Sequence, residues 1–223
     1  MDPNQPLTAI IFLGIGRFFI LIFSVIIHEC SHGLAALRNG DDTAKLMGRL
    51  TLNPLPHLDP FGTFILPGLL LFVFKSPIII GWAKPVPINP FRFRDFRRGM
   101  IEVGTSGPLS NIILALFFAS LFRITGSSID NVAGFLLYFG VFINFLLSFF
   151  NLIPVPPLDG SRILGSLLPR RMETVYYRLE RYGILIIFAL LLFGLFDFLF
   201  PLLAYLTKMV TGAALPFLGV VSQ

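Results

Sequence analysis

The residues best suited to chemistry are two histidines and a glutamate in the stretch HECSH, residues 28–32. On a helix, residues four apart share one face, so the imidazoles of His28 and His32 could reach a single zinc ion. Glu29 would lie beside that ion, where a carboxylate can take a proton from a metal-activated water. This H-E-x-x-H pattern predicts a zinc site with an adjacent general base.

The alternative reading of the pattern is a polar spot buried in a helix bundle, because three fixed letters in five also recur by chance. A long apolar run precedes His28, and ionisable groups inside a membrane span are costly and mark functional sites. Haem ligation is disfavoured, because two imidazoles on one turn point the same way and cannot bind opposite faces of one haem. These considerations favour zinc.

A catalytic zinc ion takes three protein ligands and leaves one position for water. Two residues could supply the third ligand: Asp159, in the stretch VPPLDG, and His57, the remaining histidine of the chain. We favour Asp159, since it follows an apolar segment and precedes Gly160, which permits a sharp turn. Its alternative role is to cap a helix or a turn, so spacing leaves both ligands open.

The composition is that of an integral membrane protein. Of 223 residues, 55% are hydrophobic and 13% are charged, against about 25% charged in soluble domains; the mean hydropathy is +0.83. The net charge of +5 is spread over several loops, as in the cytoplasmic loops of membrane proteins, and predicts no nucleic-acid partner.

The apolar segments predict an all-α polytopic helix bundle. A membrane helix needs about 20 apolar residues. Four segments qualify as complete spans: 7–37, 99–122, 132–150 and 182–206. Residues 61–80 are apolar but interrupted by proline and glycine, which favours a re-entrant or bent segment. The polar loop 39–59 is expected to hold a small β element near the active site.

Loop charges predict the orientation. Two stretches rich in arginine and lysine, 84–98 and 162–181, flank the second and third complete spans, whereas the loop between those spans contains only Arg123. Because cytoplasmic loops collect basic residues, the two stretches are expected in the cytoplasm. If 61–80 is re-entrant, which we favour, both termini lie outside; a complete span there would instead put the loop 39–59 outside. The His28–His32 pair then lies nearer the cytoplasmic side.

Three motifs in order, HECSH, GPLSN (residues 107–111) and NLIPVPPLDG (residues 151–160), resemble the site-2 protease family of intramembrane zinc metalloproteases. The small prokaryotic members without a PDZ domain are the most similar. NPLPHLDPFG and GWAKPVP resemble the same group. The resemblance covers about residues 20–165. It implies a multi-pass protein of a prokaryotic cell membrane.

The resemblance also implies roles for individual residues. His28, His32 and Asp159 would bind one Zn2+ ion per chain, with Glu29 as general base. Asn111 would position the peptide or its oxyanion, and residues after the histidine helix would offer a strand edge to an unwound substrate. His57 would then lie in a second layer or the substrate channel.

The sequence assigns no single role to two further polar residues. Asn151 could steady the Asp159 loop or the substrate, or could only bond across helices. The sequence offers no account of Asp197, in the last apolar segment.

The expected activity is hydrolysis of peptide bonds in transmembrane substrates, as in regulated intramembrane proteolysis, by one integral-membrane domain (1–223; core 7–168, C-terminal span 182–206). The expected partners are a transmembrane protein or peptide and the lipid bilayer. Two alternatives remain: a zinc transporter or metal sensor, and a catalytically silent relative that binds membrane helices. A transporter would more naturally show symmetric halves, which the sequence lacks.

Overall fold

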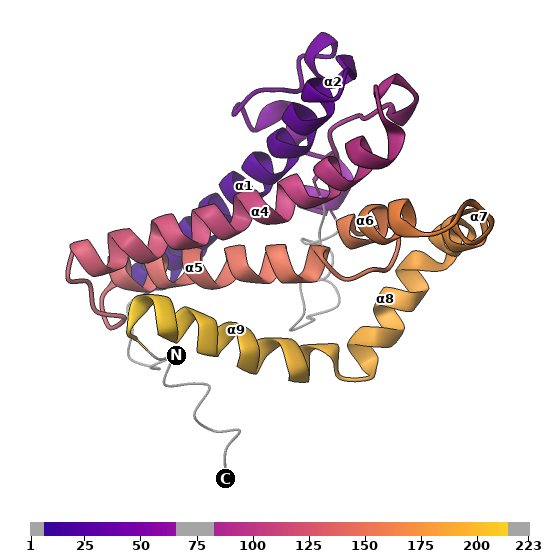
Figure 1. The fold of residues 1–223 in the computed structure, drawn as a ribbon. Coiled ribbons are helices and arrows are strands. Elements are labelled where there is room, and N and C mark those ends of the chain that lie inside the picture. The colour runs from indigo at the N-terminus through magenta and orange to yellow at the C-terminus, as the bar shows by residue number, and fades with distance from the viewer. Residues whose placement is uncertain (1–6, 66–82, 214–223) are drawn as a thin grey trace.

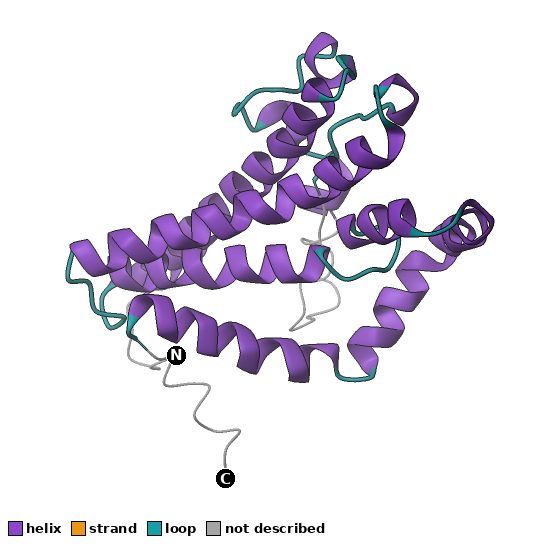
Figure 2. Ribbon diagram, in the orientation of Figure 1, coloured by secondary structure: helices purple, strands orange, loops and turns teal. Residues whose placement is uncertain are grey.

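The computed structural model describes residues 7–65 and 83–213, and in these ranges the chain is mainly helical (Figures 1 and 2). The α-helices are α1 (Leu7–Arg38), α2 (Thr43–Leu46), α4 (Phe96–Ile124), α5 (Val132–Asn151), α6 (Asp159–Leu167), α7 (Arg170–Tyr177), α8 (Gly183–Leu192) and α9 (Leu195–Thr211). Short helical segments wound more tightly or more widely than an α-helix are η1 (Leu55–His57), η2 (Pro60–Ile65), η3 (Pro90–Arg92) and η4 (Arg178–Tyr182).

Among the described residues, three helices are long and apolar enough to cross a membrane: Phe12–Arg38 within α1, all of α4 and all of α5. They correspond to the first three complete spans expected from the sequence. Side-chain caps define where two of them begin. Asp95 accepts a hydrogen bond from the Arg98 N–H (3.1 Å) at the start of α4, and Asn131 accepts one from the Gly134 N–H (2.7 Å) at the start of α5. Each cap satisfies a helix N–H group that would otherwise have no partner.

The expected span over 182–206 is bent in the structure. The chain forms two helices there, α8 and α9, which bend by 76° at the break, and counting the bent pair as one span brings the total to four among the described residues. Gly194 lies at the break with φ of +90°, a left-handed conformation that ends one helix before the next begins. Asp197 lies just after the break, in the first turn of α9, where the helix dipole stabilises a negative charge.

Helix α4 is central to the bundle, since it packs against α1, α5, α6 and α9 (Figure 1). A buried cluster joins α4, α5 and α9 and consists of Ala115, Ala119, Val141, Phe145, Leu199 and Leu203. The alanines let the helix backbones approach closely, which favours helix association in a membrane. Helix α6 follows the end of α5 and lies against α4, near the half of α1 that carries the histidines.

The expected small β element in the loop 39–59 is also wrong: this loop contains α2, turns and η1, with no strand (Figure 2). The buried carboxylate of Asp41 explains the outcome. It accepts hydrogen bonds from the backbone N–H groups of Thr43 (3.0 Å) and Asn89 (2.7 Å). A side chain thus satisfies backbone groups that a strand would have paired.

The expected re-entrant segment 61–80 lies mostly outside the described residues. Its described beginning, Pro60–Ile65, is a wide helical turn. The Asp59 carboxylate holds this turn by accepting a hydrogen bond from the Gly62 N–H (2.6 Å).

Candidate metal centre

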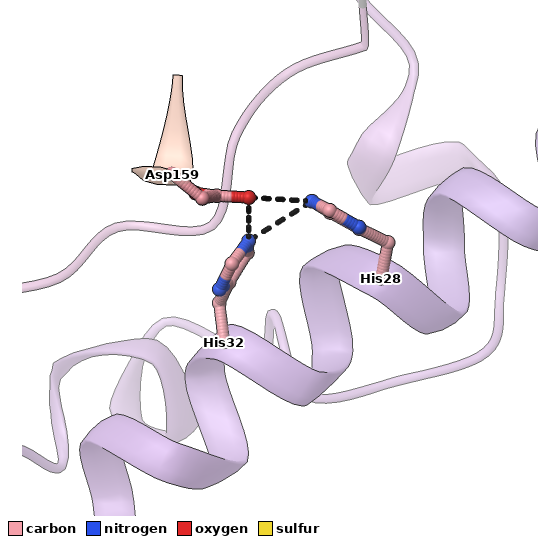
Figure 3. A group of neighbouring side chains, drawn as sticks. All are labelled: His28, His32 and Asp159. Carbon is pink, nitrogen blue, oxygen red and sulfur yellow. Dashed lines mark hydrogen bonds and ion pairs between the residues drawn. The ribbon is translucent and has the colours of Figure 1, made fainter. Parts of the chain in front are cut away.

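His28, His32 and Asp159 meet at one point inside the helix bundle (Figure 3). The Nε2 atoms of the two imidazoles are 3.0 Å apart, and Asp159 Oδ2 lies 3.1 Å from each of them. All three residues are buried. The structure therefore brings together the three residues that the sequence proposes as metal ligands.

The histidines reach this point because they lie one turn apart on α1, whereas Asp159 arrives from the first residue of α6 (Figure 3). Two glycines allow the close approach of the Asp159 backbone. A Cβ atom on Gly104 of α4 would lie 2.9 Å from the Asp159 carbonyl oxygen, and one on Gly160 would lie 2.2 Å from the Leu152 carbonyl oxygen. Only glycine fits at such distances.

The inner wall of the centre is a third glycine, Gly107 of the GPLSN motif. A Cβ atom at this position would lie 2.5 Å from Nε2 and Cε1 of His32 and 2.6 Å from Cε1 of His28. Helix α4 therefore packs its bare backbone directly against both imidazole rings. The glycine at the first position of the motif is therefore required because any larger side chain would collide with the imidazole rings.

The other ring nitrogen of each histidine has its own partner. His32 Nδ1 lies 2.7 Å from the Val103 carbonyl oxygen, and His28 Nδ1 lies 2.6 Å from Asn111 Oδ1. A carbonyl oxygen can only accept, so the Nδ1 of His32 carries a proton and its Nε2 is free to bind a metal. Outer hydrogen bonds of this kind orient the histidines of metal sites.

The donor set fits zinc. Two imidazole nitrogens and a carboxylate oxygen are the ligands of many catalytic zinc sites, and tetrahedral ligands about 2.0 Å from zinc are separated by about 3.3 Å, close to the 3.0–3.1 Å found here. Burial raises the pKa of the Asp159 carboxyl, but hydrogen bonds and charge interactions with His28 and His32 lower that pKa by more. Asp159 is therefore anionic at neutral pH, the form that binds a cation.

Glu29 is held by a distant segment of the chain. Its Oε2 accepts a hydrogen bond of 2.7 Å from the backbone N–H of Val86. Arg49 in turn holds the segment before Val86, since its Nη2 donates to the carbonyl oxygens of Lys84 (2.8 Å) and Pro85 (3.2 Å). No feature of the sequence indicates this contact, because a backbone N–H can come from any residue other than proline.

His57 is buried but does not join the group. Its Nε2 lies 2.9 Å from the Thr51 carbonyl oxygen, and its own carbonyl oxygen accepts a hydrogen bond of 2.8 Å from the Lys84 N–H. Of the two candidates for the third ligand, the structure thus places Asp159, and not His57, beside His28 and His32.

The two asparagines named from the sequence have different surroundings. Asn111 is fully buried, and its Oδ1 contacts the ring nitrogen of His28 that points away from Asp159. Asn151 makes a local bond, from its Nδ2 to the Leu147 carbonyl oxygen (2.9 Å). Contact of Asn111 with a peptide or oxyanion, and of Asn151 with substrate, stay predictions.

A buried His–His–Asp cluster, a neighbouring glutamate and membrane-spanning helices together define the class of membrane-embedded zinc metalloproteases. The family model described as peptidase family M50 matches residues 121–194, a range that includes Asp159.

Named relatives agree with this class. YwhC of Bacillus subtilis is 40% identical over 177 residues, which cover 76% of this chain and 77% of YwhC. Rip2 of Mycolicibacterium smegmatis is 28% identical over 195 residues (86% of this chain, 71% of Rip2), and MJ0611 of Methanocaldococcus jannaschii is 29% identical over 173 residues (74% and 82%). All three names describe zinc metalloproteases. No solved structure matches the chain.

The chain therefore belongs to peptidase family M50, the site-2 protease family that its motifs resemble. It is a zinc metalloprotease, and Zn2+ is its cofactor.

Proposed function

We propose that this protein hydrolyses peptide bonds within transmembrane segments of its substrates, with His28, His32 and Asp159 as zinc ligands. The observation that supports the proposal is the location of the cluster: two of its three residues lie on α1, a helix apolar enough to span a membrane, and all three are buried among helices. A protease centre at that depth acts on peptide bonds that lie in the bilayer.

Glu29 is proposed as the general base. Zinc, when bound to the three ligands, supplies the Lewis acidity that makes an attacking water acidic and polarises the scissile carbonyl. The Glu29 carboxylate takes the proton of that water and delivers it to the leaving amine. The Val86 N–H holds one oxygen of this carboxylate, which leaves the other oxygen for proton transfer.

The substrate must unwind before attack, because a helix hides its peptide bonds in its own hydrogen-bond ladder. Helix-breaking residues near the cut should therefore favour cleavage. The basic residues of the loops support a cytoplasmic location for the end of the bundle near the histidines. Water would then reach the zinc site from the cytoplasmic side. The proposal includes one integral-membrane domain, residues 1–223, in a prokaryotic cell membrane.

The test is the Glu29→Gln variant, reconstituted in liposomes with a single-span model substrate. Loss of a general base costs about 10²- to 10⁴-fold in rate, so we expect cleavage to fall by that factor while zinc content stays at that of the wild type. Mass spectrometry of the products should place the wild-type cut inside the apolar segment. Wild-type cleavage by Glu29→Gln would refute the role of Glu29, and a cut outside the bilayer would refute the intramembrane substrate.

The same variant separates the proposal from a transporter or metal sensor. Glutamine keeps the size of the side chain and can still accept the Val86 hydrogen bond. A transporter that used only the three metal ligands would keep its function in this variant.

A further inference from the structure

A buried chain of hydrogen bonds runs from His28 to two residues that have no place in the zinc site. Asn111 Nδ2 donates to Asn144 Oδ1 over 2.8 Å, and Asn144 Nδ2 donates to Ser24 Oγ over 2.8 Å. Ser24, Asn111 and Asn144 have no exposed surface. This series of hydrogen bonds joins α1, α4 and α5, and it ends at the Nδ1 atom of His28.

The direction of every bond in this chain is fixed, because three backbone carbonyl oxygens anchor it. The Ser24 hydroxyl donates to the Ile20 carbonyl (2.7 Å), so its oxygen is left to accept from Asn144. The Nδ2 group of Asn144 uses its second proton on the Gly140 carbonyl (2.8 Å). Carbonyl oxygens accept only, so Asn144 must turn its nitrogen toward Ser24 and its oxygen toward Asn111.

The orientation of Asn144 determines that of Asn111. Since Asn144 presents an oxygen, Asn111 must present Nδ2 to it, and the second Nδ2 proton points to the Ser24 carbonyl oxygen (3.4 Å). Asn111 then has only its oxygen for His28. The Nδ1 atom of His28 must donate the 2.6 Å bond, and the lone pair of the ring is left on Nε2, the nitrogen that faces Asp159 and His32.

We propose that Asn144 and Ser24 are positioning residues that fix the tautomer of His28 through Asn111, so that its Nε2 is free to bind zinc. The inference rests on the proposed function in one respect, that His28 is a zinc ligand. An asparagine alone would not fix the tautomer, because its amide can turn over and offer NH2 instead of oxygen. The carbonyl anchors remove that freedom.

A purely structural role makes a different prediction. Buried asparagines and serines also tie membrane helices together, and in that case loss of Asn144 would weaken the bundle without a specific effect on one imidazole. The tautomer of His28 in the metal-free protein is therefore the decisive observable. It depends on neither zinc binding nor protease activity.

The experiment is NMR of the metal-free protein in detergent, labelled with 15N-histidine, at a pH where the imidazoles are neutral. The chain has three histidines, so only three rings contribute, and each can be assigned from a variant that lacks it. In the wild type, we expect His28 to carry its proton on Nδ1. In Asn144→Leu, Asn111 Nδ2 is left with the long 3.4 Å bond to the Ser24 carbonyl oxygen, so we expect its amide to turn over and give a mixture of both tautomers of His28. Unchanged Nδ1 protonation in a folded Asn144→Leu would overturn the proposal.

The spectrum contains its own control, because His32 Nδ1 faces the backbone carbonyl of Val103 and should not respond to Asn144. A second control is Asn151→Leu, which removes an asparagine of the same helix whose Nδ2 bonds to the Leu147 carbonyl oxygen; the His28 tautomer should not change. If Asn144→Leu fails to fold, Asn144→Ala takes its place, because it removes the same Oδ1 acceptor of Asn111 Nδ2 with a smaller side chain. The presence or absence of a second tautomer is read in the same way.

A rescue variant distinguishes positioning from packing. In Asn111→Asp both side-chain oxygens accept, so His28 keeps its Nδ1 proton whichever way the carboxylate turns. The double variant Asn111→Asp with Asn144→Leu should therefore restore Nδ1 protonation, although it restores no bond between the helices. Absence of rescue would favour a structural role and overturn the proposal.

Cobalt affinity gives a second readout. Loss of an outer-layer partner of a metal ligand typically costs about 10- to 100-fold in affinity, so Asn144→Leu should bind Co2+ about tenfold more weakly, with an altered visible spectrum. Wild-type affinity together with a mixed tautomer would overturn the link to the metal. Failure of the wild type to bind any metal would refute the proposed function, while the tautomer result would still stand.

Discussion

The backbone N–H of Val86 donates a 2.7 Å hydrogen bond to Oε2 of Glu29, although 57 positions separate the two residues. This bond connects the segment before α4 to the residue proposed as general base. Hydrogen bonds to charged groups are worth about 1.5–3 kcal/mol, enough to hold the Glu29 carboxylate in one position. The segment that contains Val86 thus helps to position the carboxylate of Glu29, the proposed general base.

The Val86→Pro variant removes this N–H group and no other donor. We expect the cleavage rate to fall by about tenfold or more, as a loss of about 1.5 kcal/mol implies, while zinc content stays at the wild-type level. The rate should be measured on the reconstituted enzyme at saturating substrate. Val86 is buried, so the matched control is Val86→Ala, which loses packing but keeps the N–H. An equal loss of activity in both variants would assign the effect to packing.

Gly107→Ala should damage the metal centre directly. The added Cβ would lie 2.5 Å from His32 and 2.6 Å from His28, so the rings or helix α4 must shift and the arrangement of the ligands is disturbed. Because zinc sites depend on ligand geometry, we expect zinc affinity to fall by at least about tenfold, measured by competition with a chelator. Gly14→Ala, on α1 with nothing within 4 Å of its added Cβ, should bind zinc like the wild type. Wild-type affinity in Gly107→Ala would show that the rings are not confined by α4.

Zinc content distinguishes the two candidates for the third ligand. Asp159→Ala removes an oxygen 3.1 Å from both imidazole nitrogens, and we expect the purified protein to lose its zinc. His57→Ala should keep about one zinc ion per chain, because His57 binds Thr51 instead. The measurement is metal analysis of the detergent-purified variants beside the wild type. Zinc loss in His57→Ala alone would transfer the ligand role to His57.

The histidine pair could be predicted from the sequence because its geometry is local: residues four apart on a helix share a face whatever the fold. The choice between Asp159 and His57 could not be made from spacing, since it depends on which distant segment packs against α1. The motif resemblance settled on Asp159, and the structure brings Asp159 to the histidines. The motif resemblance also names Asn111, but its position behind His28 depends on the packing of α4 against α1.

The differences between the expected and the observed fold have physical causes too. The loop 39–59 has polar and apolar residues that resemble a short strand, but the buried Asp41 carboxylate binds the backbone N–H groups of Thr43 and Asn89. The bend within the last apolar segment could not be predicted, because average hydropathy does not register a single glycine in a left-handed conformation. In both cases one residue decided the backbone path.

Substitution of Gly194 tests whether the bend between α8 and α9 depends on a left-handed residue. Its φ of +90° costs other L-residues about 1–2 kcal/mol, and a Cβ atom there would lie 2.9 Å from Asp197 Oδ2. We therefore expect Gly194→Ala to lower the free energy of unfolding by about 1–2 kcal/mol, measured by denaturant titration in detergent micelles. Gly194→Asn is the matched control, because asparagine tolerates the left-handed region better than alanine, and it should lose less stability. If Gly194→Ala were as stable as the wild type, the bend between α8 and α9 would not depend on a left-handed residue at this position.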